Sequence, residues 1–275
     1  MALFTLNFES QYLNGNTEVG VIMPDKPRTT DPKDFYLSGE KYKVLWLLHG
    51  TFGDYSDWIR KSNIELYACE NDLVVVMPSA LNSDYTNWDK FANGYDMYNY
   101  MINELMPLIY GWFPVSQKRE DNFIAGLSMG GGGTLKFALT DSEKFAGAAI
   151  LSSSPFHYEV TPLESDPKRA ARTQNKFDNK GGYESFLASD DNVWRLFEEK
   201  VKAHADLPKM FFAIGGDDHG IERFKHFKEH ADELGFEAVW EIIPGYVHEW
   251  RIWDITIQHA LAFFGFSSRD KGNAF

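Results

Sequence analysis

The chain has 275 residues, a formal net charge of −13 at pH 7, and 44% hydrophobic and 16% aromatic residues. A chain of this length can bury a large core, so one domain is expected over residues 1–275. The acidic balance argues against nucleic acids and anionic membranes as partners, because both attract clustered Lys and Arg. With Cys69 as the single cysteine and no Cys/His cluster of zinc spacing, we expect no disulfide, metal or cofactor.

The amino-terminal part predicts strands. Residues 4–8 and 18–23 alternate apolar and polar side chains, whereas Pro24 to Lys41 is rich in Pro, Asp and Lys and predicts an exposed loop. The first residues carry no basic region of the kind that opens a signal peptide. No apolar run approaches the roughly 18 residues that a membrane span needs, so a cytoplasmic protein is expected.

The rest of the chain alternates buried strands with helical segments. Five continuous apolar runs end at Gly, Pro, Ser or His, as strands of a parallel sheet do; they are residues 44–48, 73–77, 123–127, 147–151 and 210–214. Segments of helical period lie between and after them, at residues 55–69, 97–111, 131–138, 221–234 and 247–264. This order predicts an α/β fold with a mostly parallel sheet.

One stretch, Ser154 to Pro208, interrupts the alternation. Residues 159–183 are polar and charged, and residues 184–204 have a helical pattern. An insertion that follows the carboxyl end of a strand lies on the ligand side of an open sheet. We therefore consider two interpretations of residues 154–208, a cap-like insertion over the active site and a plain surface excursion.

The motif Gly126-Leu127-Ser128-Met129-Gly130 carries the chemistry. It follows an apolar run and opens onto three more glycines. A serine between glycines two residues before and after it is typical of an abrupt strand-to-helix turn that exposes the serine hydroxyl as a nucleophile. The alternatives are a glycine-rich turn in which Ser128 caps a helix and a phosphate-binding loop, and the second lacks the Gly-Lys-Ser/Thr ending.

A serine nucleophile needs a base and an orienting carboxylate, which follow in the order acid, then histidine, in this type of sheet. Asp217 and Asp218 come directly after the run 210–214. We favour Asp218, which lies three residues past Gly215 and so clears the turn, although Asp217 remains open. The predicted base is His248, which follows a strand at residues 238–243 and precedes the last helix.

Two backbone N–H groups are expected to stabilise the oxyanion, those of Met129 and Thr51, the second in the loop after the run 44–48. His49 in that loop is interpreted as a hydrogen-bonded anchor. An aromatic substrate pocket could be lined by Trp58, Trp88 and Trp250, together with Tyr95 and Tyr98, with core packing as the alternative for each of them.

Five stretches carry a family resemblance: Tyr42–Gly50, Trp58–Tyr67, Val74–Ala80, Phe113–Asp121 and Phe123–Gly131. Through them the chain resembles the tributyrin esterases within the esterase D-like α/β-hydrolases. That group is similar to S-formylglutathione hydrolases, to acetyl-xylan and feruloyl esterases and, more distantly, to mycolyltransferases. The resemblance is strong over residues 42–155 and weak over residues 156–209.

The resemblance implies an eight-stranded hydrolase sheet with helices on both faces, and a homo-oligomer. It carries a catalytic triad onto Ser128, Asp218 and His248, and the oxyanion donors onto Thr51 and Met129. The chain departs from the family at one glycine, Gly132, where tributyrin esterases often have a bulkier residue.

The leading hypothesis is a serine carboxylesterase for short acyl esters, such as acetyl or feruloyl esters of plant carbohydrates. Its substrate would be a small ester, including an acylated sugar. The alternatives are a thioesterase of the S-formylglutathione hydrolase type and a hydrolase-fold binding protein without enzymatic activity. The intact set of serine, acid and histidine argues against the binding protein, which does not need it. High activity on the thioester with little activity on aryl acetates would favour the thioesterase.

Overall fold

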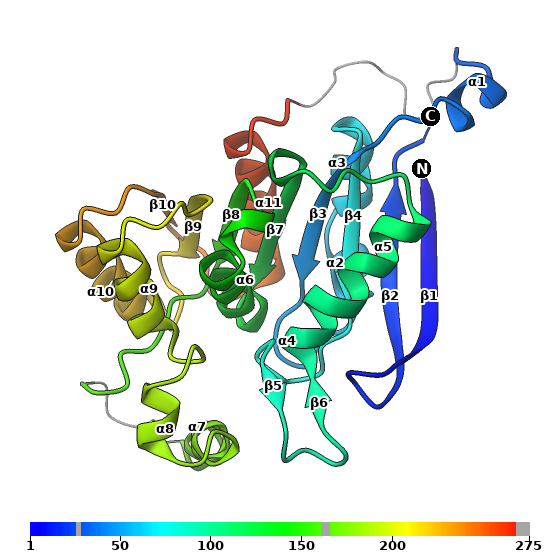
Figure 1. Cartoon of the computed structure of the whole chain (residues 1–275). Helices are drawn as coiled ribbons and strands as arrows, with labels where there is room; N and C mark the ends of the chain where they lie inside the picture. The colour runs from blue at the N-terminus through cyan, green and yellow to red at the C-terminus, as the bar shows by residue number, and fades with distance from the viewer. Residues whose placement is uncertain (26–28, 161–165, 268–275) are drawn as a thin grey trace.

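The structure, a computed structural model, describes residues 1–25, 29–160 and 166–267. Eight strands form one sheet: β1 (Ala2–Ser10), β2 (Gly15–Met23), β3 (Lys43–Leu48), β4 (Leu73–Pro78), β7 (Asn122–Leu127), β8 (Gly147–Leu151), β9 (Lys209–Gly215) and β10 (Val239–Ile243). Their order across the sheet is β1-β2-β4-β3-β7-β8-β9-β10 (Figure 1). Only β2 runs against its neighbours, so the expected mostly parallel eight-stranded sheet is confirmed. A separate two-stranded ribbon consists of β5 (Asn87–Trp88) and β6 (Tyr95–Asp96).

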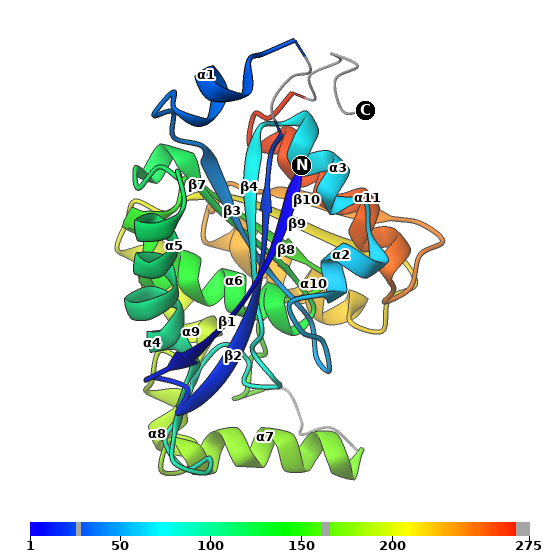
Figure 2. The ribbon, with the colours of Figure 1, turned by 90° about the vertical axis from the view of Figure 1, so that its right-hand side faces the viewer.

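Both faces of this sheet are covered by helices, as Figure 2 shows edge-on. One layer contains α4 (Met97–Tyr100), α5 (Met106–Trp112), α6 (Met129–Thr140), α9 (Val193–Lys202) and α10 (Ile221–Glu233). The other contains α2 (Asp57–Lys61), α3 (Ile64–Glu70) and α11 (Trp250–Phe263). The expectation of helices on both faces is thereby confirmed.

The continuous apolar runs follow from this arrangement, because a strand between two helical layers is buried on both sides. In β3, Trp46 and Leu48 pack into the core beneath α5 and α6. Leu45 and Leu47, which point the opposite way, pack into the core beneath α2 and α11. Each apolar run therefore supplies side chains to two separate cores.

Two expected helices differ in detail from the structure. The helix expected at residues 55–69 is broken into α2 and α3, where the Asp254 carboxylate accepts a hydrogen bond from the Asn63 N–H at 2.9 Å. Between α4 and α5 the helix has a π-turn at Met101–Leu105, next to Pro107, which has no N–H to continue the normal ladder.

The loop expected at residues 24–41 contains a short helix, α1 (Pro32–Tyr36). Asp31 caps it by accepting a hydrogen bond from the Lys33 N–H at 2.9 Å, so local capping creates a turn of helix in a polar segment. Residues 26–28 of that loop lie outside the described part of the chain.

The insertion at residues 154–208 has two structurally different parts. Its first helices, α7 (Pro167–Asn179) and α8 (Tyr183–Leu187), lie beyond the carboxyl ends of the parallel strands (Figures 1 and 2). Its last helix, α9, buries Leu196 and Phe197 in the core shared with α6 and α10. Only the part before α9 therefore extends over the edge of the sheet, and residues 161–165 of it lie outside the described residues.

In the part of the chain that the structure describes, no helix is both long and apolar enough to cross a membrane.

Two neighbouring glycines of α6 have opposite surroundings. A Cβ at Gly133 would lie 2.7 Å from a ring carbon of Tyr85, whereas a Cβ at Gly132 would meet nothing closer than the Ser153 Oγ at 3.7 Å. The position where the resembled esterases often carry a larger residue therefore has room for one.

We expect Gly132→Ala to raise the free energy of unfolding by about 1 kcal/mol, because alanine loses less backbone entropy than glycine in a helix. Gly133→Ala is expected to lower it by about 1–3 kcal/mol through overpacking against Tyr85. Urea unfolding followed by circular dichroism measures both variants. A Gly133→Ala protein as stable as Gly132→Ala would contradict the close packing of α6.

Candidate active site

Ser128 stands at an abrupt turn between β7 and α6. Its backbone adopts φ 52° and ψ −116°, a conformation that costs a residue with a side chain about 1–3 kcal/mol. The turn is held by two hydrogen bonds, from the Ser128 N–H to the Leu151 carbonyl at 2.8 Å and from the Gly132 N–H to the Ser128 carbonyl at 3.1 Å. This strained geometry presents the hydroxyl at the carboxyl end of β7.

The flanking glycines of the motif allow the turn to pack closely. A Cβ at Gly126 would lie 2.4 Å from the carbonyl oxygen of Gly130. A Cβ at Gly130 would lie 2.6 Å from the carbonyl oxygens of both Leu48 and His49. Since a backbone atom cannot move aside as a flexible side chain can, both positions require glycine.

Three side chains from three strand ends form one hydrogen-bonded chain. The Nε2 atom of His248 lies 2.9 Å from the Oγ of Ser128, and its Nδ1 atom lies 2.7 Å from the Oδ2 of Asp218. Ser128 follows β7, Asp218 follows β9 and His248 follows β10. The imidazole can therefore take the serine proton on one nitrogen while the carboxylate orients the other.

The two aspartates after β9 occupy different environments. Asp218 is 2% exposed, and its Oδ1 accepts a hydrogen bond from the Gly220 N–H at 2.8 Å. Asp217 is exposed. Burial acts to raise the pKa of Asp218, but the hydrogen bonds from His248 and Gly220 outweigh it and hold that pKa below its usual value. Asp218 is therefore ionised at neutral pH, and it is the aspartate that contacts His248.

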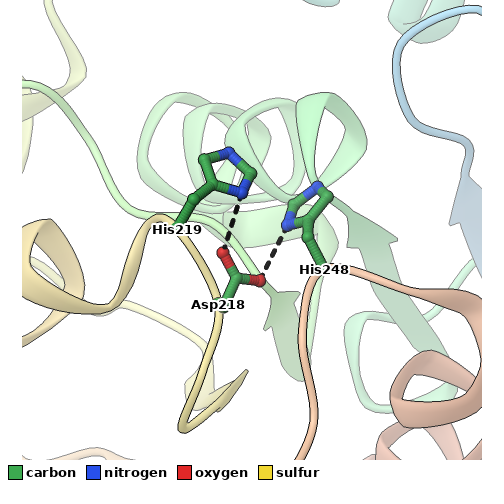
Figure 3. Close-up of side chains that lie close together, drawn as sticks. All are labelled: Asp218, His219 and His248. Carbon is green, nitrogen blue, oxygen red and sulfur yellow. Dashed lines mark hydrogen bonds and ion pairs between the residues drawn. The ribbon is translucent and has the colours of Figure 1, made fainter.

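His219 flanks the carboxylate of Asp218 on the side opposite His248 (Figure 3). Its Nδ1 lies 3.4 Å from the Asp218 Oδ1, and its ring centroid lies 4.7 Å from that of His248. Partial burial, and then the nearby His248, lower the pKa of His219. No role of this side chain was predicted from the sequence, although its position beside Asp218 was the available signal.

Asp218, His219 and His248 also form a group whose potential metal-ligand atoms all lie within 4.8 Å of one another. A cation bound there would compete with the proton that His248 Nδ1 shares with Asp218. The hydrogen-bonded arrangement of these groups suits proton transfer between His248 and Ser128.

The loop after β3 is anchored by His49. Its Nδ1 lies 2.6 Å from the Gly50 carbonyl oxygen, and its Nε2 accepts a hydrogen bond from the Ala80 N–H at 2.9 Å. This pairing requires the neutral tautomer protonated at Nδ1. Burial of the ring lowers the pKa of His49, in keeping with that neutral form. The imidazole holds the loop that carries Thr51 next to the carboxyl end of β7.

Thr51 and Met129 line the same cavity as Ser128. Met129 is the first residue of α6, so its N–H is one of those that a helix leaves without an acceptor inside itself. The positive end of the α6 dipole points to the same place, which favours negative charge beside Ser128. Both residues expected to stabilise the oxyanion thus line the cavity that contains Ser128.

The cavity has a volume of about 870 Å³. Trp88 and Trp250 are among its lining residues, as the sequence analysis expected of a pocket. Trp58 is not: it is 1% exposed, donates a hydrogen bond to the Leu48 carbonyl at 3.1 Å and packs edge-on against Trp250 with ring centroids 5.2 Å apart. The expectation that Trp58 contacts substrate is corrected, because its ring supports Trp250 from the core.

Sequence reasoning also missed the basic side chains of this cavity. Arg172 and Lys176 of α7 line it, as does Arg223 of α10. The available signal was their spacing: Arg169, Arg172 and Lys176 are three and four residues apart and so share one face of a helix.

Comparisons with known proteins agree with this geometry. The Esterase family model (description "Putative esterase") matches residues 10–263. An acetyl esterase of Caldicellulosiruptor saccharolyticus is 30% identical over 262 residues, which cover 94% of this chain and 97% of that protein. The crystal structure of an S-formylglutathione hydrolase from Staphylococcus aureus is 30% identical, with a TM-score of 0.79 and coverage of 96% and 98% of the two chains. A ferulic acid esterase at 21% identity, with a TM-score of 0.69 and 96% coverage of both chains, shares the fold.

The buried anchor His49 predicts a pH dependence of stability. Its pKa in the folded protein is lowered from 6.5, so the unfolded chain takes up a proton first as the pH falls below 6.5. Stability contributed by neutral His49 is complete above that pH and is lost on acidification, with a slope of at most about 1.4 kcal/mol per pH unit. We expect His49→Gln to be less stable at pH 7.5 but to lose less stability between pH 7 and pH 5.5.

Urea unfolding at a series of pH values measures this difference in slope. Replacement of the exposed His204 by Asn serves as the control and is expected to keep the wild-type slope. Equal slopes for the wild type and His49→Gln would contradict the assignment of His49 as a neutral anchor.

Proposed function

This chain belongs to the Esterase family, and on that premise we propose that it hydrolyses short-chain acyl esters through an acyl-enzyme formed on Ser128. Membership makes it a carboxylic ester hydrolase. The observation that carries the proposed mechanism is the hydrogen-bonded chain from Ser128 through His248 to Asp218. Its order along the sequence, serine, acid and histidine, is the order that α/β-hydrolases use.

In the proposed reaction, His248 Nε2 takes the proton of Ser128 as its Oγ attacks the ester carbonyl carbon. The tetrahedral oxyanion accepts hydrogen bonds from the N–H groups of Met129 and Thr51. His248 then gives its proton to the departing alcohol, which leaves the acyl group on Ser128. A water, deprotonated by His248, repeats the sequence and releases the carboxylic acid. Asp218 stays ionised throughout and orients the imidazole.

The substrate side of the proposal rests on the cavity and on the relatives. An acetyl esterase among the relatives supports a short acyl group. Trp88 and Trp250 line a cavity large enough for a sugar or an aromatic alcohol, which supports acetyl or feruloyl esters of plant carbohydrates as substrates. Within a single domain, the insertion at residues 154–208 acts as the cap over this cavity through its helices α7 and α8. A homo-oligomeric state and a cytoplasmic location stay predictions.

A thioesterase activity is the second candidate, favoured by the similarity to an S-formylglutathione hydrolase. The same acyl-enzyme on Ser128 would serve an ester or a thioester, so the site geometry does not separate them. The two activities are separated by measuring the ratio of kcat/KM on para-nitrophenyl acetate to kcat/KM on S-formylglutathione. A binding protein without activity is disfavoured, because it has no need of a hydrogen-bonded serine, histidine and aspartate.

Removal of the proposed nucleophile tests the function. We expect Ser128→Ala to lower kcat on para-nitrophenyl acetate by at least about 10³-fold, with circular dichroism unchanged, because only oxyanion stabilisation and binding remain. A fluorophosphonate probe followed by mass spectrometry of the wild type is expected to modify the peptide that contains Ser128. Undiminished activity in Ser128→Ala would overturn the assignment.

A matched pair of variants separates the neighbouring aspartates. Asp218→Asn is expected to reduce kcat by about 10⁴-fold, because an amide that donates a hydrogen bond to His248 selects the wrong tautomer. Asp217→Asn removes the same charge from an exposed site and is expected to leave kcat within about twofold, as surface substitutions usually do. Steady-state kinetics on one aryl ester compares them, and equal losses would refute the role of Asp218.

A further inference from the structure

The wall of the cavity formed by α7 is basic in a chain whose net charge is −13. Within Pro167–Asn179 there are four basic residues, Lys168, Arg169, Arg172 and Lys176, all of which line the cavity. Asp178 is the one acidic residue of that helix and is absent from the lining. Helix α7 lies beyond the carboxyl ends of the strands (Figure 2), and its basic side chains line the same cavity as Ser128.

The guanidinium of Arg172 contacts the loop after β3 that carries Thr51. Its Nη1 donates a hydrogen bond to the Thr51 Oγ1 at 3.2 Å, and its Nη2 lies 2.6 Å from the Asp84 Oδ1. The side chain is 36% exposed, so part of its guanidinium fork faces the cavity. A guanidinium has five N–H donors in a fixed plane, and these two contacts leave donors for a further acceptor.

Asp84 carries two positive partners. The Nζ of Lys176 lies 2.9 Å from its Oδ2, on the opposite side from Arg172. Burial acts to lower the pKa of Lys176, but the charge of Asp84 outweighs it and raises that pKa, so the ammonium stays protonated at neutral pH. One carboxylate thus faces two cations, and the group of Arg172, Lys176 and Asp84 keeps one net positive charge.

A second guanidinium lies on the α10 side of the same cavity. Arg223 stacks on the ring of Phe156, with Cζ 3.9 Å from the ring centroid, and its Nε donates to the Ser154 Oγ at 3.2 Å. Stacking holds the planar guanidinium in place on the wall of the cavity. The cavity therefore has arginines on two elements that are far apart in the sequence.

Among the residues that the structure describes, the other carboxylates that line the cavity already have partners. Asp57 pairs with Lys61 at 2.8 Å, and Asp218 pairs with His248. Asp166 caps α7 by accepting from two backbone N–H groups at 2.8 and 3.2 Å. Asp191 pairs with both Lys136 and Lys180. None of these four carboxylates faces Arg172 or Lys176 in the contacts that the structure shows.

We propose that the wall formed by Arg172 and Lys176, with Arg223 opposite, binds a carboxylate of the substrate, so that this esterase prefers esters that carry a negative charge. This inference rests on the proposed ester hydrolysis. A carboxylate matches the planar fork of Arg172 and would share it with Asp84 and Thr51. In an acidic protein, a cavity of opposite sign also concentrates anionic esters near Ser128.

The carboxylate can belong to either half of the ester, and two matched substrate pairs separate these cases. On the alcohol side, para-acetoxybenzoate is compared with its methyl ester, which is neutral. On the acyl side, para-nitrophenyl hemisuccinate is compared with para-nitrophenyl butyrate. In each pair, kcat/KM is divided by the hydroxide-catalysed rate, which removes differences in intrinsic reactivity. We expect the anionic member of one pair to be preferred, and the preference to fall with added salt.

Substitutions in the basic wall test whether it causes this preference. Arg172→Gln is expected to reduce the anionic-to-neutral ratio of kcat/KM by about tenfold, because a hydrogen bond between charged groups is lost, and to change kcat/KM on the neutral ester less. Arg172→Lys is expected to retain part of the preference for the anionic ester. The control is Arg60→Gln, which removes an exposed guanidinium outside the cavity and is expected to leave the ratio unchanged. Arg223→Gln supplies an independent variant if Arg172→Gln does not fold.

A binding measurement separates failure of this inference from failure of the proposed function. Calorimetry compares para-hydroxybenzoate with its methyl ester in the wild type and in the Ser128→Ala variant, and needs no turnover. Hydrolysis of neutral esters without a preference for either anionic substrate, or an unchanged ratio in both Arg172→Gln and Arg223→Gln, would overturn the anionic subsite alone. If the wild-type protein hydrolyses no ester but binds para-hydroxybenzoate, only the proposed function is overturned.

Discussion

The site depends on how closely the turn at Ser128 packs against the end of β3. Gly126 and Gly130 let backbone meet backbone, with a Cβ at either position placed 2.4–2.6 Å from a carbonyl oxygen. That approach holds Ser128 at φ 52° and aims its hydroxyl out of the sheet. It also places the first N–H of α6 next to the loop that His49 anchors. The proposed nucleophile and oxyanion donors are therefore placed by these close backbone contacts.

The other proposed catalytic groups gather there because parallel strands end at the same edge of a sheet. Asp218 and His248 leave β9 and β10 at that edge and meet 2.7 Å apart. Burial of Asp218 excludes water from its contact with the imidazole, and the Gly220 N–H helps to keep the carboxylate ionised without water. The chemistry is thus built on rigid strand ends, whereas substrate recognition is left to the inserted helices.

The insertion contributes both to the core of the fold and to the wall of the cavity. Its last helix, α9, completes the core on one face of the sheet, and buried Asp191 ties the segment before it to Lys136 of α6. Separating the buried Asp191 carboxylate from Lys136 and Lys180 would cost free energy. Because Lys180 directly follows α7, these ion pairs hold α7 at a defined place over the cavity. That placement allows Arg172 to reach Thr51 across 121 positions of sequence.

The sequence by itself predicted the mostly parallel sheet, the turn at Ser128 and His248 as the proposed base, because apolar runs, paired glycines and a histidine after the last strand are local signals. It favoured Asp218 over Asp217, but only burial and the contact with His248 separate the two. It could not tell that Trp58 lies under Trp250, nor that Arg172 meets Asp84, since these contacts join distant segments. The proposed reacting groups follow from local sequence pattern. The walls of the cavity depend on how an inserted segment packs over the sheet, which only the tertiary structure decides.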